Sequence, residues 1–262
     1  MTTLVYPQLE TGALSQFPVR KTRRTRTVTN RAADGSTIKL TDPAGVTTEW
    51  TLSYTDLSDR EAATLRAFFE AAEGSLNGFT FLDPSGNLLS WSDQLTNAIW
   101  QRDPALTLAG GVADPGGGTR AWSIANRGAA VQAISQTIAA PGDCRYCLTA
   151  YLRAAAPASA RLLAGSDSAS VNVNSVWNRS MLTTSPQAGA ISMRFGIEAA
   201  ASATVEIYGI QVEAQPGPSG YKATSRGGVY ENAHLREDAL AITRTGIDRN
   251  SCTVKIIHVN HL

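Results

Sequence analysis

The sequence predicts a mainly β protein: a small α+β domain of split-barrel type, made of a sheet plus one helix, with an inserted jelly-roll β-sandwich. Three observations support this. The spacing of an amphipathic helix is clear only in residues 58–72. Short apolar runs separated by turn residues fill residues 90–224, as in a sandwich. The last residues alternate like a strand, and an isolated strand pair is not stable by itself.

Residues 50–87 contain a strand, a helix and a second strand in close succession. Apolar and polar residues alternate in the first strand, so one of its faces is buried. Ser58 and Glu61 have the spacing of a capping box that starts the helix. Gly74 is the expected left-handed C-terminal cap. The remaining apolar positions are Ala62, Leu65, Phe68, Phe69 and Ala72 in the helix and Phe79 and Phe81 in the second strand.

The N-terminal segment consists of a lead-in and a basic run. Residues 1–19 carry turn signals and are predicted to form an arm or a loosely anchored lead-in. In a strand, the basic side chains that follow would point to both faces, and no aromatic residue is interleaved for base stacking. We therefore favour a solvated or subunit-bridging edge strand over nucleic-acid binding. The basic residues are Arg20, Lys21, Arg23, Arg24 and Arg26, with Arg31 after a break.

Two turns are predicted before Trp50. Asp34 and Gly35 form a hairpin signal, and a short strand is expected at residues 37–40. Residues 42–45 (DPAG) have proline at the second position, which is typical of a β-turn.

The inserted sandwich is predicted from nine candidate strands between residues 90 and 224. They are Leu106–Leu108, Ala121–Ile124, Val131–Ile138, Tyr146–Arg153, Arg161–Leu163, Val171–Val173, Trp177–Thr183, Ile191–Ile197 and Thr204–Val212.

The C-terminal segment has a short polar stretch and then two strands, at residues 241–245 and 253–259. They are expected to join the sheet of the first domain, because chain termini often lie close together. The first domain is therefore predicted to be discontinuous, comprising residues 1–89 and 225–262, and the insertion comprises residues 90–224.

Composition excludes several classes of function. The chain has 262 residues, 17% of them charged, and a net charge of +1, so no polyelectrolyte partner is implied. No apolar run approaches the roughly 20 residues of a membrane span, so no membrane insertion is expected. The N-terminus lacks the blocks of a signal peptide, and we expect synthesis in a cytoplasm.

The three cysteines are interpreted as structural thiols. Cys144 and Cys147 fall within one predicted strand, where residues three apart point to opposite faces at about 10 Å, too far for a disulfide. A zinc site would need two further ligands, and no nearby motif supplies them. The role of this pair is otherwise open, as is that of Cys252.

No catalytic residue, cofactor or metal ligand is predicted. The sequence lacks a nucleophile elbow, a zinc-protease helix and a phosphate loop. The carboxylates of residues 56–61 surround a helix N-terminus, where capping explains them. The histidines are His234, His258 and His261.

The first domain resembles the distal tail (baseplate hub) proteins of tailed phages and their gene-transfer-agent relatives. The resemblance lies in a pattern of tryptophan, leucine and tyrosine, a capped helix, a glycine and an F-x-F-x-D-P strand, and in a closing Asp238-x-Leu240. In this sequence the pattern is Trp50, Leu52, Tyr54, Leu57, Leu65, Phe68, Phe69, Gly74, Phe79, Phe81, Asp83 and Pro84.

The middle region resembles the carbohydrate-binding-module-like jelly rolls that are inserted in phage tail proteins. The residues that carry this resemblance are Asn97 and Trp100, Tyr151 to Ala154, Trp177 and Arg179, Ile210 to Glu213, and Pro218, Ser219, Tyr221 and Thr224. Tryptophans of such a module either fill the core or stack on sugar rings. Trp100 and Trp177 match motif positions and are expected in the core, which leaves Trp91 and Trp122 as possible glycan-stacking residues.

The resemblance implies a structural protein of the virion at the tail tip, assembled in the host cytoplasm. Family members form rings, usually hexamers, that join the tail tube to the baseplate hub, fibres or receptor-binding proteins. Arg20, Lys21, Arg23, Arg24 and Arg26 would then be inter-subunit or channel-lining residues, meeting DNA only in transit. The alternative is a glycan-binding module for host attachment. An enzyme is not expected.

Overall fold

The computed structural model describes residues 4–259, and strands dominate it. The predicted mainly β class, with antiparallel sheets and a sandwich, is confirmed. The chain divides into two units. Unit 1 comprises residues 4–10, 15–81 and 230–259 of the described part, and unit 2 comprises residues 11–14 and 82–229. The segment after residue 82 belongs to unit 2 because it is hydrogen-bonded there, with the Leu88 amide 2.8 Å from the Val212 carbonyl oxygen.

Unit 1 is a six-stranded sheet with one helix, α1 (Asp59–Ala72). The strand order is β1-β2-β16-β14-β3, and β15 pairs with β16. The C-terminal strand β16 pairs with β2 along most of its length, so both ends of the chain contribute to this sheet. The strands are β1 (Val19–Arg31), β2 (Thr37–Leu57), β3 (Phe79–Leu82), β14 (Val229–Leu235), β15 (Ile242–Gly246) and β16 (Arg249–Val259). Strand β14 lies in the stretch that was expected to be polar and irregular.

Helix α1 begins and ends as its sequence predicts. The Ser58 hydroxyl accepts from the Glu61 amide and the Glu61 carboxylate accepts from the Ser58 amide, so the predicted capping box is confirmed. The left-handed conformation starts at Glu73, one residue before the predicted Gly74, which shares it with φ +63°. Phe68 faces the core and Phe69 is only half-buried. The helix packs on a core that includes Trp50, Leu52, Phe79 and Phe81.

The lead-in is not a loose arm over the residues that the structure describes. Tyr6 is buried, its hydroxyl lies 2.9 Å from that of Tyr54, and its ring lies 5.1 Å from the ring of Phe68. Val5 forms a parallel bridge with Thr80. Buried apolar side chains therefore anchor this segment, although its turn residues predicted a loose lead-in. Residues 1–3 lie outside the described residues.

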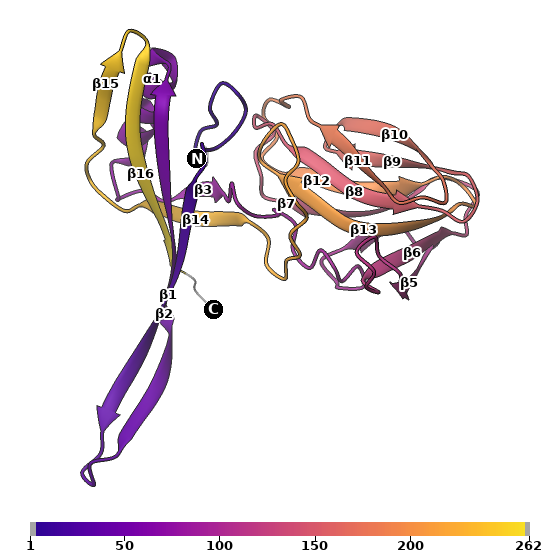
Figure 1. The fold of residues 1–262 in the computed structure, drawn as a ribbon, viewed down its shortest axis with the longest axis horizontal. Helices are drawn as coiled ribbons and strands as arrows, with labels where there is room; N and C mark the ends of the chain where they lie inside the picture. Colours follow the sequence, from indigo (N-terminus) through magenta and orange to yellow (C-terminus); the bar gives the residue numbers. More distant parts are fainter. Residues whose placement is uncertain (1–3, 260–262) are drawn as a thin grey trace. The chain divides into compact units, whose positions relative to one another are not determined.

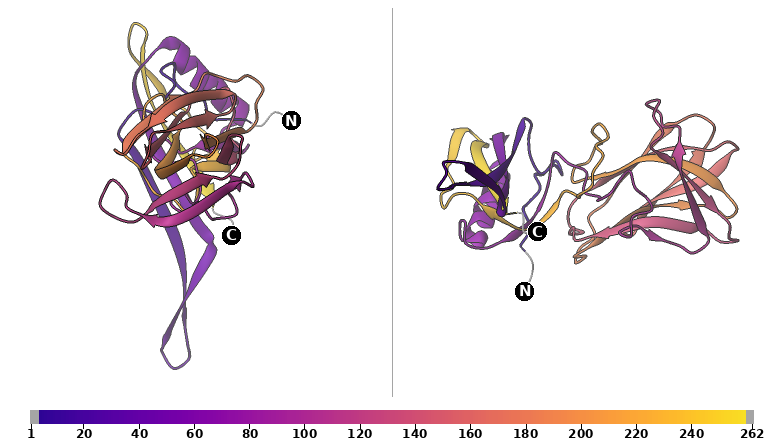
Figure 2. Two further views of the ribbon diagram at one scale, coloured as in Figure 1. Left: turned by 90° about the vertical axis from the view of Figure 1, so that its right-hand side faces the viewer. Right: turned by 90° about the horizontal axis from the view of Figure 1, so that it is seen from below.

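Strands β1 and β2 form a hairpin that extends beyond the rest of unit 1 (Figures 1 and 2). Among residues 4–259, β16 pairs with β2 only from Thr47 to Leu57, and residues 26–31 and 37–42 pair only with each other. The predicted turn at residues 42–45 is wrong, because Asp42 pairs with Arg26 and residues 43–46 form a bulge within β2, opposite Thr25. The antiparallel pairing, with the Asp42 carboxylate beside Arg26, outweighs the local turn preference.

The basic run lies in β1, which is an edge strand of the sheet, as favoured from the sequence. Lys21 lies over the rings of Trp50 and Tyr230, at 5.5 and 5.7 Å. On the opposite face, the Arg24 guanidinium lies 3.3 Å from the Glu49 carboxylate. The inter-subunit or channel-lining role of these residues stays a prediction.

Unit 2 is a sandwich of two five-stranded sheets (Figure 2, right). One has the order β10-β9-β12-β7-β4 and the other β11-β8-β13-β6-β5. All nine predicted strands are present, and the two-residue β4 is additional. The strands are β4 (Gln101–Arg102), β5 (Leu106–Val112), β6 (Ala121–Asn126), β7 (Gln132–Ile138), β8 (Cys147–Arg153), β9 (Ala158–Ala164), β10 (Asp167–Val173), β11 (Asn178–Thr183), β12 (Met193–Ala199) and β13 (Thr204–Glu213).

The start and end of unit 2 are joined by backbone hydrogen bonds and by those of the Asn87 side-chain amide. The Asp83 amide donates to the Gly228 carbonyl, and the Gly228 amide donates to that of Asn87. The fully buried Asn87 side chain donates to the Ile210 carbonyl at 2.9 Å and accepts from the Val212 amide at 3.0 Å. This amide satisfies backbone groups that would otherwise be buried without partners.

Candidate functional site

The outer face of the β11-β8-β13-β6-β5 sheet carries a group of aromatic side chains, of which Tyr208 is buried and the others are half-buried. Strand alternation turns Leu148, Ala150 and Leu152 of β8 into the core and leaves Tyr151 and Arg153 outside. We call this surface the aromatic face. Its members are Tyr151, Trp177, Tyr208 and Tyr221, together with Arg120, Arg153 and Arg179.

Trp177 lies at one end of the aromatic face and is not a core residue, so the prediction from the sequence motif is wrong. It precedes β11 and is half-buried. The Arg153 guanidinium lies 4.6 Å from its ring centroid, and Arg153 Nε lies 2.6 Å from a Glu206 carboxylate oxygen. The edge position of β11 leaves the indole without a second layer above it. The ion pair therefore fixes the guanidinium that supports this indole.

The middle of the aromatic face is built on a bulge in β13. The register between β13 and β8 shifts between Tyr208 and Gln211, and Gly209 has φ +65°. A Cβ atom at Gly209 would lie 3.1 Å from the Tyr221 ring and 3.3 Å from the Tyr151 ring. Glycine is therefore required for the tyrosines to pack together here, with the rings of Tyr208 and Tyr221 5.2 Å apart.

At the far end of the aromatic face, hydrogen bonds to charged side chains fix the tyrosine hydroxyls. Arg120 donates from Nη2 to the Tyr208 hydroxyl at 2.6 Å, and the Tyr221 hydroxyl donates to the Asp93 carboxylate. Burial works against ionisation of Asp114, but amides that include those of Arg120 and Gly116 donate to its carboxylate and lower its pKa. Burial also raises the pKa of Tyr208, so its hydroxyl stays protonated near neutral pH.

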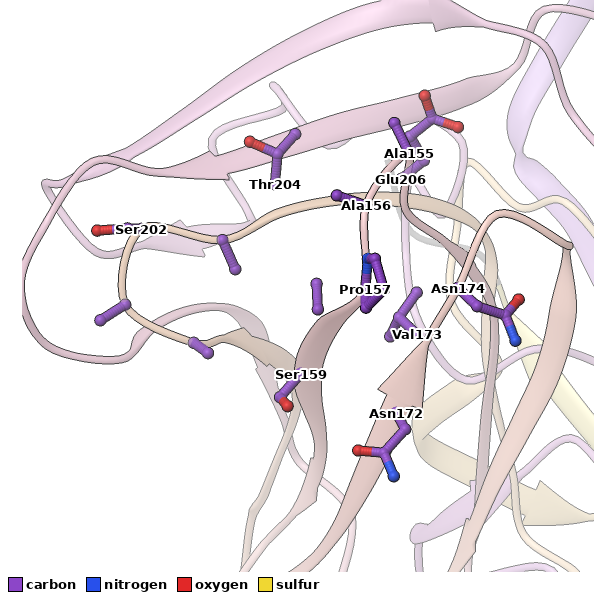
Figure 3. A pocket seen from close by; sticks show the side chains of 14 residues that line it. Ala155, Ala156, Pro157, Ser159, Asn172, Val173, Asn174, Ser202, Thr204 and Glu206 are labelled. Carbon is purple, nitrogen blue, oxygen red and sulfur yellow. The ribbon is translucent and has the colours of Figure 1, made fainter.

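A hollow of about 770 Å³ opens at one end of the sandwich (Figure 3). Loops between β8 and β9, β10 and β11, and β12 and β13 surround it. Its floor is made of alanines, Pro157 and Val173, and its polar lining consists of Ser159, Asn172, Asn174, Ser202, Thr204 and Glu206. Glu206 belongs both to this lining and to the Arg153 pair. Glu206 therefore connects the hollow with Arg153 of the aromatic face.

The structure places the two predicted stacking tryptophans on and near the loop at residues 91–100. Trp91 is 36% exposed and has φ +49°. Its carbonyl accepts from the indole nitrogen of Trp100, which is 5% exposed and lies in the core as predicted. Trp122 is half-buried and donates to the Asp93 carbonyl at 2.9 Å. For both residues, stacking on a sugar ring stays a prediction, and the Trp122 indole nitrogen is already hydrogen-bonded within the protein.

The three cysteines are all buried and unpaired. Strand β8 begins at Cys147, so Cys144 lies in the preceding turn and not in the same strand, because proline and glycine interrupt the alternation there. Burial raises the pKa of Cys144, Cys147 and Cys252 to about 11 in each case. Within residues 4–259, no three His, Cys, Asp or Glu side chains are grouped to hold a metal ion.

The chemistry of this site is that of non-covalent recognition. An exposed indole offers an apolar face to the C–H groups of a sugar ring, and hydroxyl, amide and carboxylate groups match sugar hydroxyls. Fixed guanidinium groups add hydrogen-bond donors in a defined plane. No helix of the described chain has the length and apolar character to cross a membrane.

Comparisons with known proteins give structural likeness only. Neither the protein families nor the curated proteins compared with the sequence give a match. The tailspike protein 4 enzymatically active domain of bacteriophage CBA120 is 18% identical (TM-score 0.37), over 54% of this chain and 23% of that chain. The CBM22-1 xylan-binding domain of Paenibacillus barcinonensis Xyn10C is 16% identical (TM-score 0.42), over 52% and 99%. TmCBM61, solved with beta-1,4-galactotriose, is 12% identical (TM-score 0.38), over 49% and 98%.

Proposed function

We propose that unit 2 binds a saccharide of a host cell surface, and that the chain acts in host attachment as part of a phage tail. The single observation that carries the proposal is Trp177, a half-buried residue whose ring lies under the Arg153 guanidinium, the ion-pair partner of Glu206 in the lining of the hollow. Sugar recognition uses such an arrangement of one aromatic surface beside a polar recess. The phage setting is supported by the sequence resemblance.

The test is saccharide binding by the full chain and by three matched tryptophan variants, at Trp177, Trp91 and Trp122. The wild type is applied to an array of bacterial surface glycans, and hits are titrated by calorimetry. Trp177→Ala is expected to weaken binding about tenfold or more, since an aromatic contact and its buried area are lost. Trp91→Ala, on the sequence-predicted site, is expected to bind like the wild type. Ile191→Ser, at an exposed loop position, is a control variant that should fold and bind like the wild type.

Two outcomes would contradict the proposal. If Trp91→Ala or Trp122→Ala abolishes binding while Trp177→Ala does not, the site lies at the tryptophans predicted from the sequence. If the wild type binds no saccharide of a broad array, glycan binding is wrong.

A second candidate function is assembly of the tail tip, and the β1–β2 hairpin favours it. Val28, Ile38 and Leu40 are exposed, and the pairing of Val28 with Leu40 and Asn30 with Ile38 places all three on one face. A two-stranded ribbon alone is marginally stable, so we propose that a second copy of the chain covers it, as in a ring.

Assembly is tested by mass photometry at increasing concentration. The wild type is expected to form a closed oligomer that is lost when residues 27–41 are replaced by Asn-Gly. The double variant Ile38→Thr, Leu40→Thr keeps the hairpin and removes its apolar contact, and we expect it to weaken assembly. A wild type that stays monomeric at high concentration and is missing from virions would rule out this role.

A further inference from the structure

The three arginines of the aromatic face differ in how their charges are balanced. Arg153 lies 2.6 Å from the Glu206 carboxylate, and Arg120 lies 3.4 Å from that of Asp114. Arg179 has no ion pair with any residue from 4 to 259. A guanidinium stays protonated in proteins, so Arg179 is a cation without a counter-ion in the described chain.

Arg179 is held in one orientation by its neighbours. Its Nη2 nitrogen donates to the Thr149 hydroxyl at 3.0 Å, and its guanidinium lies 5.5 Å from the Tyr151 ring centroid. Its Nε nitrogen is buried and has no hydrogen-bond partner among the described residues. The side chain is half-buried. A guanidinium that is held in place, partly desolvated and without a carboxylate beside it is the arrangement that favours an oxyanion at its accessible edge.

The carboxylate of Glu213, on the same face of β13, does not fill this role. It accepts hydrogen bonds from Gln211 and Gln215 and from the amide and hydroxyl of Ser219. It forms no ion pair with Arg179 in the described structure. The Glu213 carboxylate is hydrogen-bonded to the loop that follows β13. We therefore look for the anion that binds Arg179 in a ligand.

Apolar side chains flank Arg179 on the same face. Trp177 lies two residues before it and Met181, which is 51% exposed, two residues after it. Such positions are about 6–7 Å apart along a strand, so one short saccharide can contact all three. The row presents an aromatic ring, a cation and a thioether in sequence.

We propose that the row Trp177–Arg179–Met181 selects an anionic saccharide, whose carboxylate, sulfate or phosphate group binds Arg179 while its C–H faces contact Trp177 and Met181. This inference rests on the proposed glycan-binding function and narrows its ligand class.

The experiment compares ligands that differ in charge and little else. Oligogalacturonates and their methyl esters are titrated into the full chain, and an array adds sulfated, phosphorylated and sialylated glycans with their neutral parents to identify the source of the anion. The wild type is expected to bind at least one acidic ligand about tenfold or more tightly than its neutral parent. Arg179→Gln is expected to remove this preference, and Arg179→Lys to keep part of it.

Arg161→Gln is the matched control, because Arg161 is an arginine on the other sheet, 3.3 Å from the Glu198 carboxylate. It is expected to leave the charge preference intact. Raising the salt concentration is a test without a variant, since it weakens binding of the acidic ligand more than that of the neutral one.

The outcomes separate this inference from the proposed function. Equal binding of acidic and neutral ligands, or an unchanged preference in Arg179→Gln, overturns the anionic selectivity and leaves glycan binding in place. Equal weakening of both ligands by Arg179→Gln assigns a structural role to this arginine and also overturns the selectivity. Binding of no saccharide overturns both proposals.

Discussion

Arg153 lies above the indole of Trp177, with its guanidinium carbon 4.6 Å from the ring centroid. The same guanidinium donates to Glu206, which lines the neighbouring hollow. A cation over an aromatic ring is attracted to it, and the attraction grows as water is excluded. The three side chains therefore act as one unit, and a change in any of them affects the half-buried indole.

Replacing Glu206 by glutamine is expected to weaken saccharide binding about three- to tenfold, because Arg153 loses its ion pair and is less firmly placed over Trp177. The free energy of unfolding should change by less than about 1 kcal/mol, since the pair is partly exposed. Calorimetric titration and urea denaturation measure the two effects. Glu198→Gln breaks the corresponding pair on the other sheet, so an equal loss of binding in both variants would count against this role.

The helix cap should contribute measurably to the local stability of unit 1. Ser58→Ala removes the hydroxyl that accepts from the Glu61 amide at 3.1 Å, which costs about 1 kcal/mol. Hydrogen exchange of the α1 amides is expected to become about fivefold faster. Thr64→Ala serves as the control, because the Thr64 hydroxyl donates back to the Arg60 carbonyl within the helix and caps nothing. Equal exchange in both variants would mean that the cap is dispensable.

Asn87→Ala is expected to destabilise unit 2 by about 3 kcal/mol, because it leaves the Ile210 carbonyl and the Val212 amide buried without the side-chain partner. Thermal denaturation followed by near-ultraviolet circular dichroism would detect this loss. Asn172→Ala removes an exposed amide from the rim of the hollow and should leave the melting temperature unchanged. A small effect of Asn87→Ala would show that water or backbone shifts replace the amide.

Alkaline pH should destabilise the protein through its thiols. Burial raises the pKa of Cys144, Cys147 and Cys252 from 9.0 to about 11. The stabilisation from keeping these groups protonated is fully present below pH 9 and is lost as pH rises from 9 to 11. The melting temperature is therefore expected to fall more between pH 8.5 and 10.5 in the wild type than in Cys→Ala variants. Equal falls would mean that other groups carry the pH dependence.

Local sequence patterns predicted those helices and strands in which the local preference of the residues agrees with their contacts in the fold. The Ser58–Glu61 box, the alternation around Trp50 and the runs between turn residues all describe interactions within a few positions of the chain. The bulge at residues 43–46 was missed because its turn composition is overridden by pairing of the flanking residues with β1. Strand β14 was missed because it is held by long-range pairing with β16, at His234 and Leu235, which no local sequence pattern reports.

The candidate site was less predictable, because it depends on which side of a sheet remains uncovered. Trp177 and Trp100 are equally apolar, and only the edge position of β11 leaves Trp177 half-buried while Trp100 is enclosed. Arg153 and Glu206 are far apart in sequence and meet through the pairing of β8 with β13. The alternation of Trp177, Arg179 and Met181 was a usable local signal for a shared face.

The discontinuous layout of unit 1 also sets the order in which the chain can fold on the ribosome. Unit 2 consists of the continuous residues 82–229 and the short segment 11–14, whereas β2 pairs with β16, which is made only after residue 229. At about 5–20 residues per second, roughly 7–30 s of translation separate the two parts of unit 1. During that interval β2 exposes the edge that β16 will occupy. The nascent chain therefore completes its inserted part first and is open to premature strand pairing until β16 emerges.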